Sequence, residues 1–494
     1  MTHVLFERLA ADLDAAGFTV DGLSALWGAD AAGALERGHR VPALRASGGD
    51  TPLAVLARVL LLGGSASEAE LDRALPTLAA AGARGLGLVD AEGVALLDLR
   101  PYSAVDYAGV VAWHIVSDLG ELTVGGALRE DHVLGVGGAS STLSRLMMPL
   151  EVDTALDLGT GCGIQALHLR RHARRVVATD LSLRAVEMAA RTLAVNAVDG
   201  VELRTGDLFA PVAGERFDHI VSNPPFVITP RDPDVPRYEY RDGGAVGDAL
   251  VEAVVTSVEQ HLEPGGVAQL LGNWEYHGAE GGLDRVSGWL GTTGLDAWIV
   301  ERERQSVEQY AETWIRDGGT RPGTRDFDRL YTAWLDDFAA RGVTAVGFGY
   351  VTLRRPVAGS PTLRRLEHLD GPVSSALGSH LLASLRAHDE LAVLDDAALA
   401  ARSLEIAPDV TERRHYWPGQ EHPTVMQLVQ GGGFARTIEL DTALAAVVGA
   451  CDGELPLGVV CDAVAQITEV DAAELTAEVL PKVRELVFGG LLRL

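Results

Sequence analysis

The middle of the chain alternates short apolar runs with longer segments in which apolar residues recur at helical spacing. The apolar runs lie at residues 154–159, 175–180, 201–207, 217–223, 267–274, 296–303 and 345–355. Strands separated by helices in this way are typical of a parallel sheet with helices on both faces. The pattern therefore predicts a seven-stranded, doubly wound α/β domain over residues 151–355. A helical segment at about 305–342 exceeds a normal connection between strands, and we expect it to be an insertion.

A smaller module is expected before this domain, over residues 1–105. Helical patterns there begin at the capping pair Thr51-Pro52 and at Ser67. Two short apolar runs then surround Ala91-Glu92-Gly93 and predict a pair of strands. Helices followed by such a pair indicate a winged-helix-like module.

The remaining regions are a connection, a linker and a second small module. Residues 106–150 form a linking segment, and residues 356–423 are rich in Pro, Gly and His with one helical pattern. Residues 424–494 contain three helical patterns with Asp and Thr caps and a closing apolar strand. We expect this last part to be winged-helix-like as well.

Composition and charge narrow the classes of function. The chain has 494 residues, of which 47% are hydrophobic and 22% charged, values typical of a globular multidomain protein. Its net charge of -28 argues against a broad nucleic-acid-binding face, because phosphate contacts need clustered Lys and Arg. A local basic patch remains compatible with that charge.

The cysteines and the apolar windows bear on compartment, metal and membrane. Cys162, Cys451 and Cys461 have neither the number nor the spacing of a disulfide scaffold or a zinc site. Together with the lack of a charged-then-apolar leader, they predict a cytoplasmic protein without a metal. The most apolar window, from Leu53, is short and contains Arg58, so it predicts a core helix rather than a membrane span.

A glycine-rich turn follows the first expected strand of the central domain. Gly159, Gly161 and Gly163 allow a sharp backbone turn and the close approach of a ligand, and the next helix offers free N–H groups. The G-x-G-x-G spacing after Asp157 differs from the G-x-G-x-x-G of pyrophosphate binders. Asp157 is instead free to face a cationic amino-acid group. An ordinary glycine-rich turn is the alternative interpretation.

Two more acidic residues end the next two strands. Asp180 can accept both hydroxyls of a ribose at this edge of the sheet, and Asp207 can accept the amino group of an adenine. Each alone is more often a helix N-cap. Acids at the ends of three successive strands favour a binding site.

In combination, these residues make the segment from Val152 to Arg355 resemble the class I S-adenosylmethionine-dependent methyltransferases, which have a Rossmann-like fold. The resemblance implies that S-adenosyl-L-methionine is the cofactor. It further implies a cofactor site formed by the residues that match the family's motifs, namely Asp157, Gly159, Gly161, Gly163, Asp180, Leu181, Asp207, Leu208 and Asn223.

The fourth strand ends in Asn223-Pro224-Pro225-Phe226, which matches the N-P-P-[FY] motif of the branch that methylates planar amino nitrogens. The lone pair of such a nitrogen is delocalised, so a site must hold both N–H bonds and aim the nitrogen at the methyl group. The resemblance assigns Asn223, Pro224 and Phe226 to catalysis. The Asn223 oxygen and the Pro224 carbonyl would accept the two N–H bonds, and Phe226 would offer a stacking face.

Two further segments bear on the substrate. The segment from Tyr240, YRDGGAVGDAL, resembles the one that follows the motif in release-factor glutamine methyltransferases, although a polar helix-capping turn explains it equally well. The segment from His132, HVLGVGGASSTLSRLMMP, lies where those enzymes close over the cofactor, but it departs from their Pro-Arg-Pro-Glu-Thr pattern. We expect a macromolecular acceptor, and a glutamine side chain of a protein is our first choice.

Two alternatives to a protein glutamine remain open. One is an exocyclic amine of a ribosomal RNA base, because the same turn serves adenine and guanine. The other is a regulatory or assembly factor without enzymatic activity, against which the intact Asn223 argues.

Overall fold

The computed structural model of the protein describes residues 2–106, 108–125, 128–374 and 376–494. The chain divides into two compact units. One comprises Met1–Ser144 with Leu150–His368, and the other comprises Arg145–Pro149 with Leu369–Leu494. In the described part of the chain, no helix is both long and apolar enough to cross a membrane.

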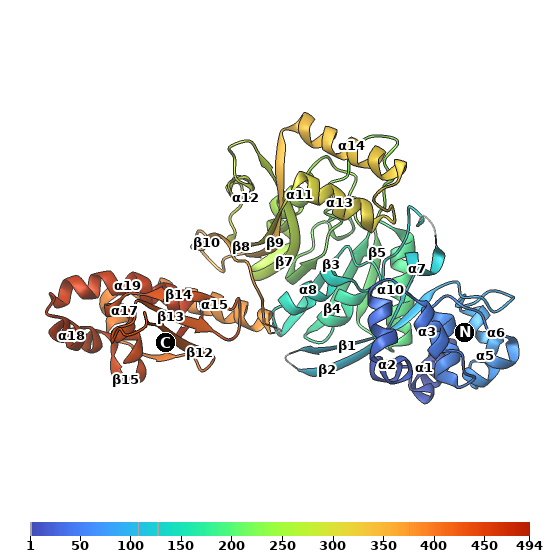
Figure 1. The fold of residues 1–494 in the computed structure, drawn as a ribbon, viewed down its shortest axis with the longest axis horizontal. Helices are drawn as coiled ribbons and strands as arrows, with labels where there is room; N and C mark the ends of the chain where they lie inside the picture. Colours follow the sequence, from blue (N-terminus) through green and yellow to red (C-terminus); the bar gives the residue numbers. More distant parts are fainter. Residues whose placement is uncertain (1, 107, 126–127, 375) are drawn as a thin grey trace. The chain divides into compact units, whose positions relative to one another are not determined.

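A large, mostly parallel sheet forms the centre of the first unit (Figure 1). Its strand order is β10-β8-β9-β7-β6-β3-β4-β5, and β9 runs antiparallel to both of its neighbours. The strands are β3 (Val152–Leu158), β4 (Ala173–Asp180), β5 (Val201–Thr205), β6 (Phe217–Ser222), β7 (Leu262–His277), β8 (Asp296–Ser306), β9 (Val343–Arg354) and β10 (Arg364–His368). The predicted α/β class is confirmed. The sequence pattern indicated the first seven strands, whereas β10 is an added edge strand that pairs parallel to β8.

Helices cover both faces of the sheet and enclose two hydrophobic cores. The helices are α9 (Ile164–Leu169), α10 (Leu183–Val195), α11 (Ala249–Ser257) and α12 (Gly282–Leu290), with short 3₁₀ turns η2 (Ala210–Val212) and η3 (Val258–His261). Apolar side chains of α9 and α10 belong to one core. Those of α11 and α12 pack in the other core with Leu156 and Leu158 of β3.

The N-terminal residues continue the first of these cores. Their helices are α1 (Thr2–Ala16), α2 (Val20–Glu36), α3 (Val41–Ala46), α4 (Pro52–Leu56), the π-helix η1 (Ala57–Leu61), α5 (Glu68–Ala74) and α6 (Ala79–Gly85). The expected caps are present, because Thr51 Oγ1 accepts from Ala54 N and Ser67 forms a capping box with Glu70. Phe18 shares the core with Met188 of α10, so the N-terminal helices and the sheet form one unit.

The N-terminal hairpin lies later in the chain than the sequence pattern placed it. Around residues 91–93 the structure has a tight turn, with Asp90 accepting from Glu92 N and Val94 N and an isolated bridge between Val89 and Ala95. The regular hairpin consists of β1 (Asp98–Asp106) and β2 (Gly109–Ser117). A polar turn between apolar runs marks both places, so the pattern alone did not distinguish them.

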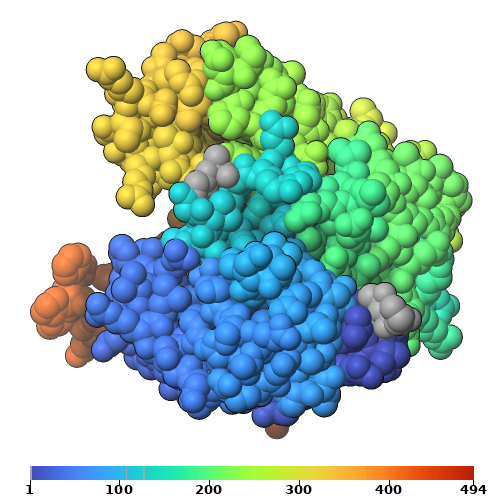
Figure 2. Space-filling view, turned by 90° about the vertical axis from the view of Figure 1, so that its right-hand side faces the viewer, coloured from blue at the N-terminus to red at the C-terminus, as the bar shows by residue number. Residues whose placement is uncertain are grey.

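The connection to the sheet contains two helices, α7 (Glu121–Val124) and α8 (Gly138–Leu146). Figure 2 shows this segment (cyan) at the surface between the N-terminal helices (blue) and the residues of the helical insertion (yellow). The insertion consists of α13 (Val307–Asp317) and α14 (Arg325–Arg341), between β8 and β9. Its aromatic side chains, among them Tyr310 and Trp334, form a small core together with Val227 and Ile228, which follow β6.

The second unit has two three-stranded sheets, β15-β11-β16 and β12-β13-β14. Its helices are α15 (Leu377–Ala392), α16 (Asp396–Ala400), α17 (Thr442–Gly449), α18 (Leu457–Thr468) and α19 (Ala472–Phe488). Its strands are β11 (Ser403–Ile406), β12 (Val410–His415), β13 (Val425–Gln430), β14 (Thr437–Leu440), β15 (Asp452–Pro456) and β16 (Leu492–Arg493). Three helices and a closing strand lie where the pattern indicated them. Strands β11 and β12 lie in the region expected to be linker, and the winged-helix-like character of the unit stays a prediction.

Candidate active site

A cavity of about 370 Å³ opens at the carboxyl edge of the sheet. It lies where the strand order changes direction between β3 and β6, the point at which open α/β sheets bind ligands. Its walls come from the turns after β3, β4, β5 and β6 and from residues 132–135, 239–240 and 242–244. The predicted site residues that line it are Gly159, Gly161, Asp180, Leu181, Asp207, Leu208, Asn223 and Pro224.

The glycine-rich turn places backbone against the cavity. Gly159, Gly161 and Gly163 have φ angles of 79°, 53° and 87°, in the left-handed region that L side chains rarely adopt. Gly163 lies outside the cavity wall, and a Cβ there would meet Cα and Cβ of Ala189 at 3.2 Å. Gly163 therefore serves the packing of α9 against α10, while Gly161 forms part of the wall.

Asp157 lies beneath the turn rather than in the wall. Its side chain is fully buried, and Oδ2 accepts from Thr160 Oγ1 at 2.6 Å. Oδ1 has no hydrogen-bond partner among the residues that the structure describes. Burial raises the pKa of Asp157 to about 7, and the Asp180 carboxylate adds to this rise. A buried carboxylate with an oxygen left over suits a cationic group above the turn.

Asp180 supports the turn and faces the cavity at once. Its Oδ2 accepts from Gly161 N and its Oδ1 from Ser182 N, both at 2.9 Å. Each oxygen keeps a second lone pair for a ligand. Burial raises the pKa of Asp180, the two backbone donors oppose this rise, and Glu239 adds to it. Asp180 is therefore held in place by two backbone donors, and the negative charge of Glu239 acts on it in the same cavity.

The turn after β5 presents Asp207 and Leu208. Asp207 is exposed and lines the cavity, whereas Asp180 is half-buried. Leu208 has a φ angle of 42°, a left-handed conformation that costs a non-glycine residue about 1–3 kcal/mol. Strain of this kind is found where the surrounding structure fixes a residue at a binding site.

The Asn-Pro-Pro-Phe turn closes the cavity on the β6 side. Asn223 Oδ1 is buried and has no partner within the described parts of the chain. The turn pairs with the glycine-rich segment after Tyr240, because Val227 N donates to Arg241 O at 2.8 Å and Gly243 N donates to Pro225 O at 3.1 Å. The resemblance of both segments to one family thus has a structural counterpart, since they form one element.

Phe226 lies behind the turn. Its ring contacts Phe348 edge-to-face at 6.5 Å between centroids, and it packs against two hydrophobic cores. It lies outside the cavity wall in this structure. Its predicted stacking face for an acceptor stays a prediction.

Residues outside the predicted set complete the wall. His132, Glu239 and Tyr240 line the cavity, and the rings of His132 and Tyr240 lie 5.8 Å apart. His132 is almost fully buried, and its Nε2 has no partner in the described structure. Burial lowers the pKa of His132, so the ring is neutral near pH 7 and offers a polar group to a ligand. The sequence indicated the segment that begins at His132, but no motif spacing singled out the His132 ring or Glu239.

Cys162 also lines the cavity, but it does not have the properties of a nucleophile. Its side chain is buried, and burial raises the pKa of the thiol to about 12. The thiol is therefore protonated at neutral pH and packs as a small apolar group. In the described residues, no cluster of three or more His, Cys, Asp or Glu side chains could hold a metal ion.

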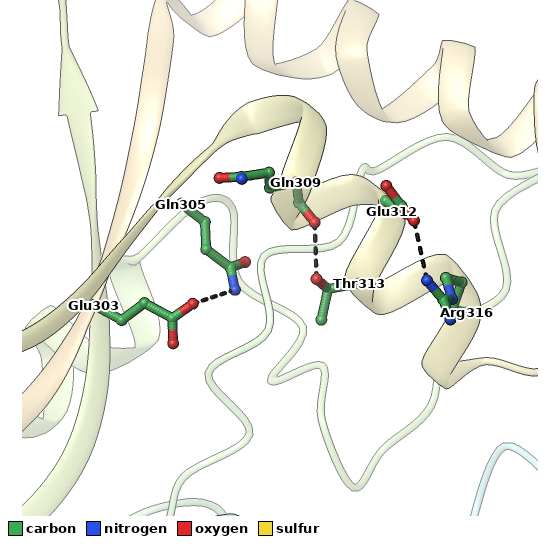
Figure 3. A pocket seen from close by; sticks show the side chains of 6 residues that line it. All are labelled: Glu303, Gln305, Gln309, Glu312, Thr313 and Arg316. Atoms are coloured by element: carbon green, nitrogen blue, oxygen red, sulfur yellow. Dashed lines mark hydrogen bonds and ion pairs between the residues drawn. The ribbon is translucent and has the colours of Figure 1, made fainter. Parts of the chain in front are cut away.

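A second hollow of about 450 Å³ lies on the outer face of α13 and the end of β8 (Figure 3). Most of its polar side chains already have partners: Gln305 Nε2 donates to Glu303 at 2.8 Å, Arg316 contacts Glu312 at 3.1 Å, and Thr313 Oγ1 donates to the carbonyl of Gln309 at 2.8 Å. Groups that are already paired at an open surface leave little for a ligand. We therefore place the active site in the cavity at the sheet edge.

Comparison with known families identifies the central segment. Residues 136–281 match the family model described as the methyltransferase small domain, and the resemblance inferred from the sequence is confirmed. The segment contains the glycine-rich turn, the three strand-end acids and the Asn-Pro-Pro-Phe turn. Two other family models, each described as a domain of unknown function, match residues 15–100 and 382–494.

Several curated proteins are similar to this segment. A ribosomal protein uL3 glutamine methyltransferase from Bradyrhizobium diazoefficiens is 35% identical over 151 residues, which are 28% of this chain and 46% of the relative. A release factor glutamine methyltransferase from Xylella fastidiosa is 35% identical over 161 residues, 31% of this chain and 58% of the relative. A ribosomal RNA small subunit methyltransferase C from Alcanivorax borkumensis is 30% identical over 184 residues, which are 36% of this chain and 45% of the relative. The chain spans about half the length of these relatives.

Proposed function

We propose that this chain transfers a methyl group from S-adenosylmethionine to the nitrogen of a planar NH2 group in a macromolecule. The single observation that carries the proposal is the Asn223 side chain, whose oxygen is buried beside the cavity without a partner in the described structure. The methyltransferase small domain family and the enzymes similar to it support the same reaction.

The charge of the cavity suits the cofactor. Asp180, Asp207 and Glu239 line it, and Asp157 lies directly beneath, so the site carries a negative field suited to a cationic ligand. In the proposal Asp180 accepts the ribose hydroxyls, Asp207 accepts the adenine amino group, and Asp157 Oδ1 faces the ammonium group. The bound cofactor would supply an electrophilic methyl group.

The acceptor nitrogen would be held by the turn after β6. Asn223 Oδ1 and the Pro224 carbonyl provide two acceptors for the two N–H bonds of an amide or exocyclic amine. The prolines and the pairing of Pro225 with Gly243 keep these acceptors fixed. Fixing the nitrogen in line with the methyl group can supply ~7–11 kcal/mol of the barrier.

We favour a glutamine side chain of a protein as the acceptor. Two of the similar enzymes are named for a ribosomal protein and for a release factor, and the net charge of -28 disfavours extensive phosphate contacts. The helical insertion has no basic excess either, since residues 305–342 contain five Arg and seven acidic residues. The second candidate is a ribosomal RNA base, because another similar enzyme is named for ribosomal RNA.

The experiment that tests this function compares cells that contain the chain, cells that lack it, and cells that contain the Asn223→Ala variant. Mass spectrometry of proteins and of ribosomal RNA should find one methylated NH2 group that depends on the chain and is lost in the variant. Methylation that depends on the chain but survives in the variant would contradict the role of Asn223. If no methylation depends on the chain, the interpretation as a regulatory or assembly factor takes precedence.

The three cysteines are free and buried, which suits the cytoplasm that we propose as the location.

A further inference from the structure

The helical insertion contacts the Asn-Pro-Pro-Phe turn through a shared core. Val227 and Ile228, the residues directly after the turn, are buried in the same cluster as Tyr310 of α13 and Trp334 of α14. The chain beyond the turn is therefore held between the sheet and the insertion.

The hydroxyl of Tyr310 lies at the centre of this contact. The side chain is fully buried, and its oxygen lies 2.9 Å from Ile228 N, which donates to it, and 3.0 Å from Nδ2 of Asn273 on β7. One oxygen thus joins the acceptor turn, the insertion and a central strand of the sheet. Because all three groups are buried, each would be costly to leave without a partner.

A second link joins the other side of the turn to α13. Arg241, whose carbonyl pairs with Val227 N, donates from Nη1 to the carbonyl of Trp314 at 2.9 Å and to Asp317 Oδ2 at 2.7 Å. Asp317 also accepts from the hydroxyl of Tyr240 in the cavity wall at 3.3 Å. Both segments of the element that carries Asn223, the turn after β6 and the segment from Tyr240, are therefore bonded to α13.

We propose that Tyr310 is a positioning residue for methyl transfer, and that α13 sets the place of the acceptor nitrogen through it. The inference rests on the proposed function. The Tyr310 hydroxyl fixes Ile228, and through Ile228 it fixes the carbonyl and amide acceptors of the turn. A displacement of about 1 Å at a reacting group can cost roughly 10²-fold in rate. Cofactor binding should not depend on Tyr310, because Asp180 and the glycine-rich turn are held by bonds of their own.

The test compares Tyr310→Phe with Tyr331→Phe, a matched control that removes a hydroxyl from α14 of the same insertion. Three quantities are measured: cofactor affinity by calorimetry, the exchange rate of the Ile228 amide by NMR or mass spectrometry, and kcat and KM for the acceptor found by the methylation survey. For Tyr310→Phe we expect unchanged cofactor affinity, Ile228 exchange at least ~10-fold faster, and a kcat ~10- to 100-fold lower with KM within about threefold. Tyr331→Phe should match the wild type in all three.

Two results would overturn the proposal: a kcat for Tyr310→Phe within about twofold of the control, or a parallel loss of cofactor affinity, which indicates a general structural role. If the wild type methylates nothing, the proposed function fails. The Ile228 exchange rate then decides alone whether the hydroxyl fixes the turn, and an unchanged rate refutes that contact.

Discussion

Replacing Asn223 by alanine is expected to slow methyl transfer far more than it changes any other property of the protein. The Asn223 oxygen is buried beside the cavity and bonds to no described residue of the chain, so its removal breaks no hydrogen bond of that oxygen within the described structure. As the acceptor nitrogen attacks, its hydrogens become more positive and the oxygen binds them more strongly. Removing one preorganised polar group from such a place costs ~2.7–4 kcal/mol, or roughly 10²–10³-fold in rate.

The assay is single-turnover methylation at saturating cofactor, combined with calorimetry of cofactor binding and thermal unfolding. Asn196→Ala is the matched control. The Asn196 side chain accepts from His114 N at 2.8 Å and donates to His114 O at 2.7 Å, and neither residue lines the cavity. Its loss should lower the free energy of unfolding by ~1–3 kcal/mol and leave the transfer rate unchanged. The reasoning is refuted if Asn223→Ala transfers methyl groups within about threefold of the wild-type rate, or if the two variants have the same profile.

Three further outcomes are expected. Asp180→Ala should weaken cofactor binding, because hydroxyls bound to a charged acceptor are worth ~1.5–3 kcal/mol per bond, and calorimetry on the folded variant checks this. Asp157, with its pKa raised to about 7, holds a proton below that pH in the free protein and must release it to face a cation, so cofactor affinity should increase with pH up to about 7 and then level off. Asp157→Asn should remove that dependence in calorimetry from about pH 5.5 to 8. Phe226→Ala should raise the acceptor KM and also lower the melting temperature through lost contact with Phe348; a change in melting temperature alone would make Phe226 a packing residue only.

The seven strands of the central domain and the main cavity residues could be predicted from the sequence because they depend on short, regular patterns. Parallel strands bring their carboxyl ends to one edge, so Asp180, Asp207 and Asn223 had to meet there once the strands were recognised. The sequence pattern could not show that Gly161 lines the cavity whereas Gly163 serves helix packing, because both belong to one evenly spaced motif. Their φ angles do not separate them either, since both are positive. Only the packing of α9 against α10 shows that Gly163 makes room for Ala189.

Contacts between distant segments were beyond the reach of such patterns. Nothing in the spacing of His132 indicates that its ring meets Tyr240 in the cavity. The same holds for Tyr310, which is 82 residues from Ile228 along the chain and bonds to it. The helical pattern at about 305–342 did predict the insertion, but its relation to the acceptor turn depends on tertiary packing. The sequence therefore predicted the residues expected to bind cofactor and acceptor better than it predicted the residues that position them, such as Tyr310.

The N-terminal helices support the cofactor site indirectly, through their packing against α10. Ser182, which precedes α10, and Ala185 in its first turn line the cavity. Leu193 and Val195 at the other end of α10 are buried in the core to which the N-terminal helices contribute. Removing the N-terminal helices would expose this apolar end of α10 to water. The exposure would cost about 25 cal/mol of folding free energy per Å² of apolar surface. A displaced α10 would carry Ser182 N away from Asp180, whose carboxylate it fixes at 2.9 Å. The N-terminal region thus stabilises the arrangement of the cofactor site without lining it.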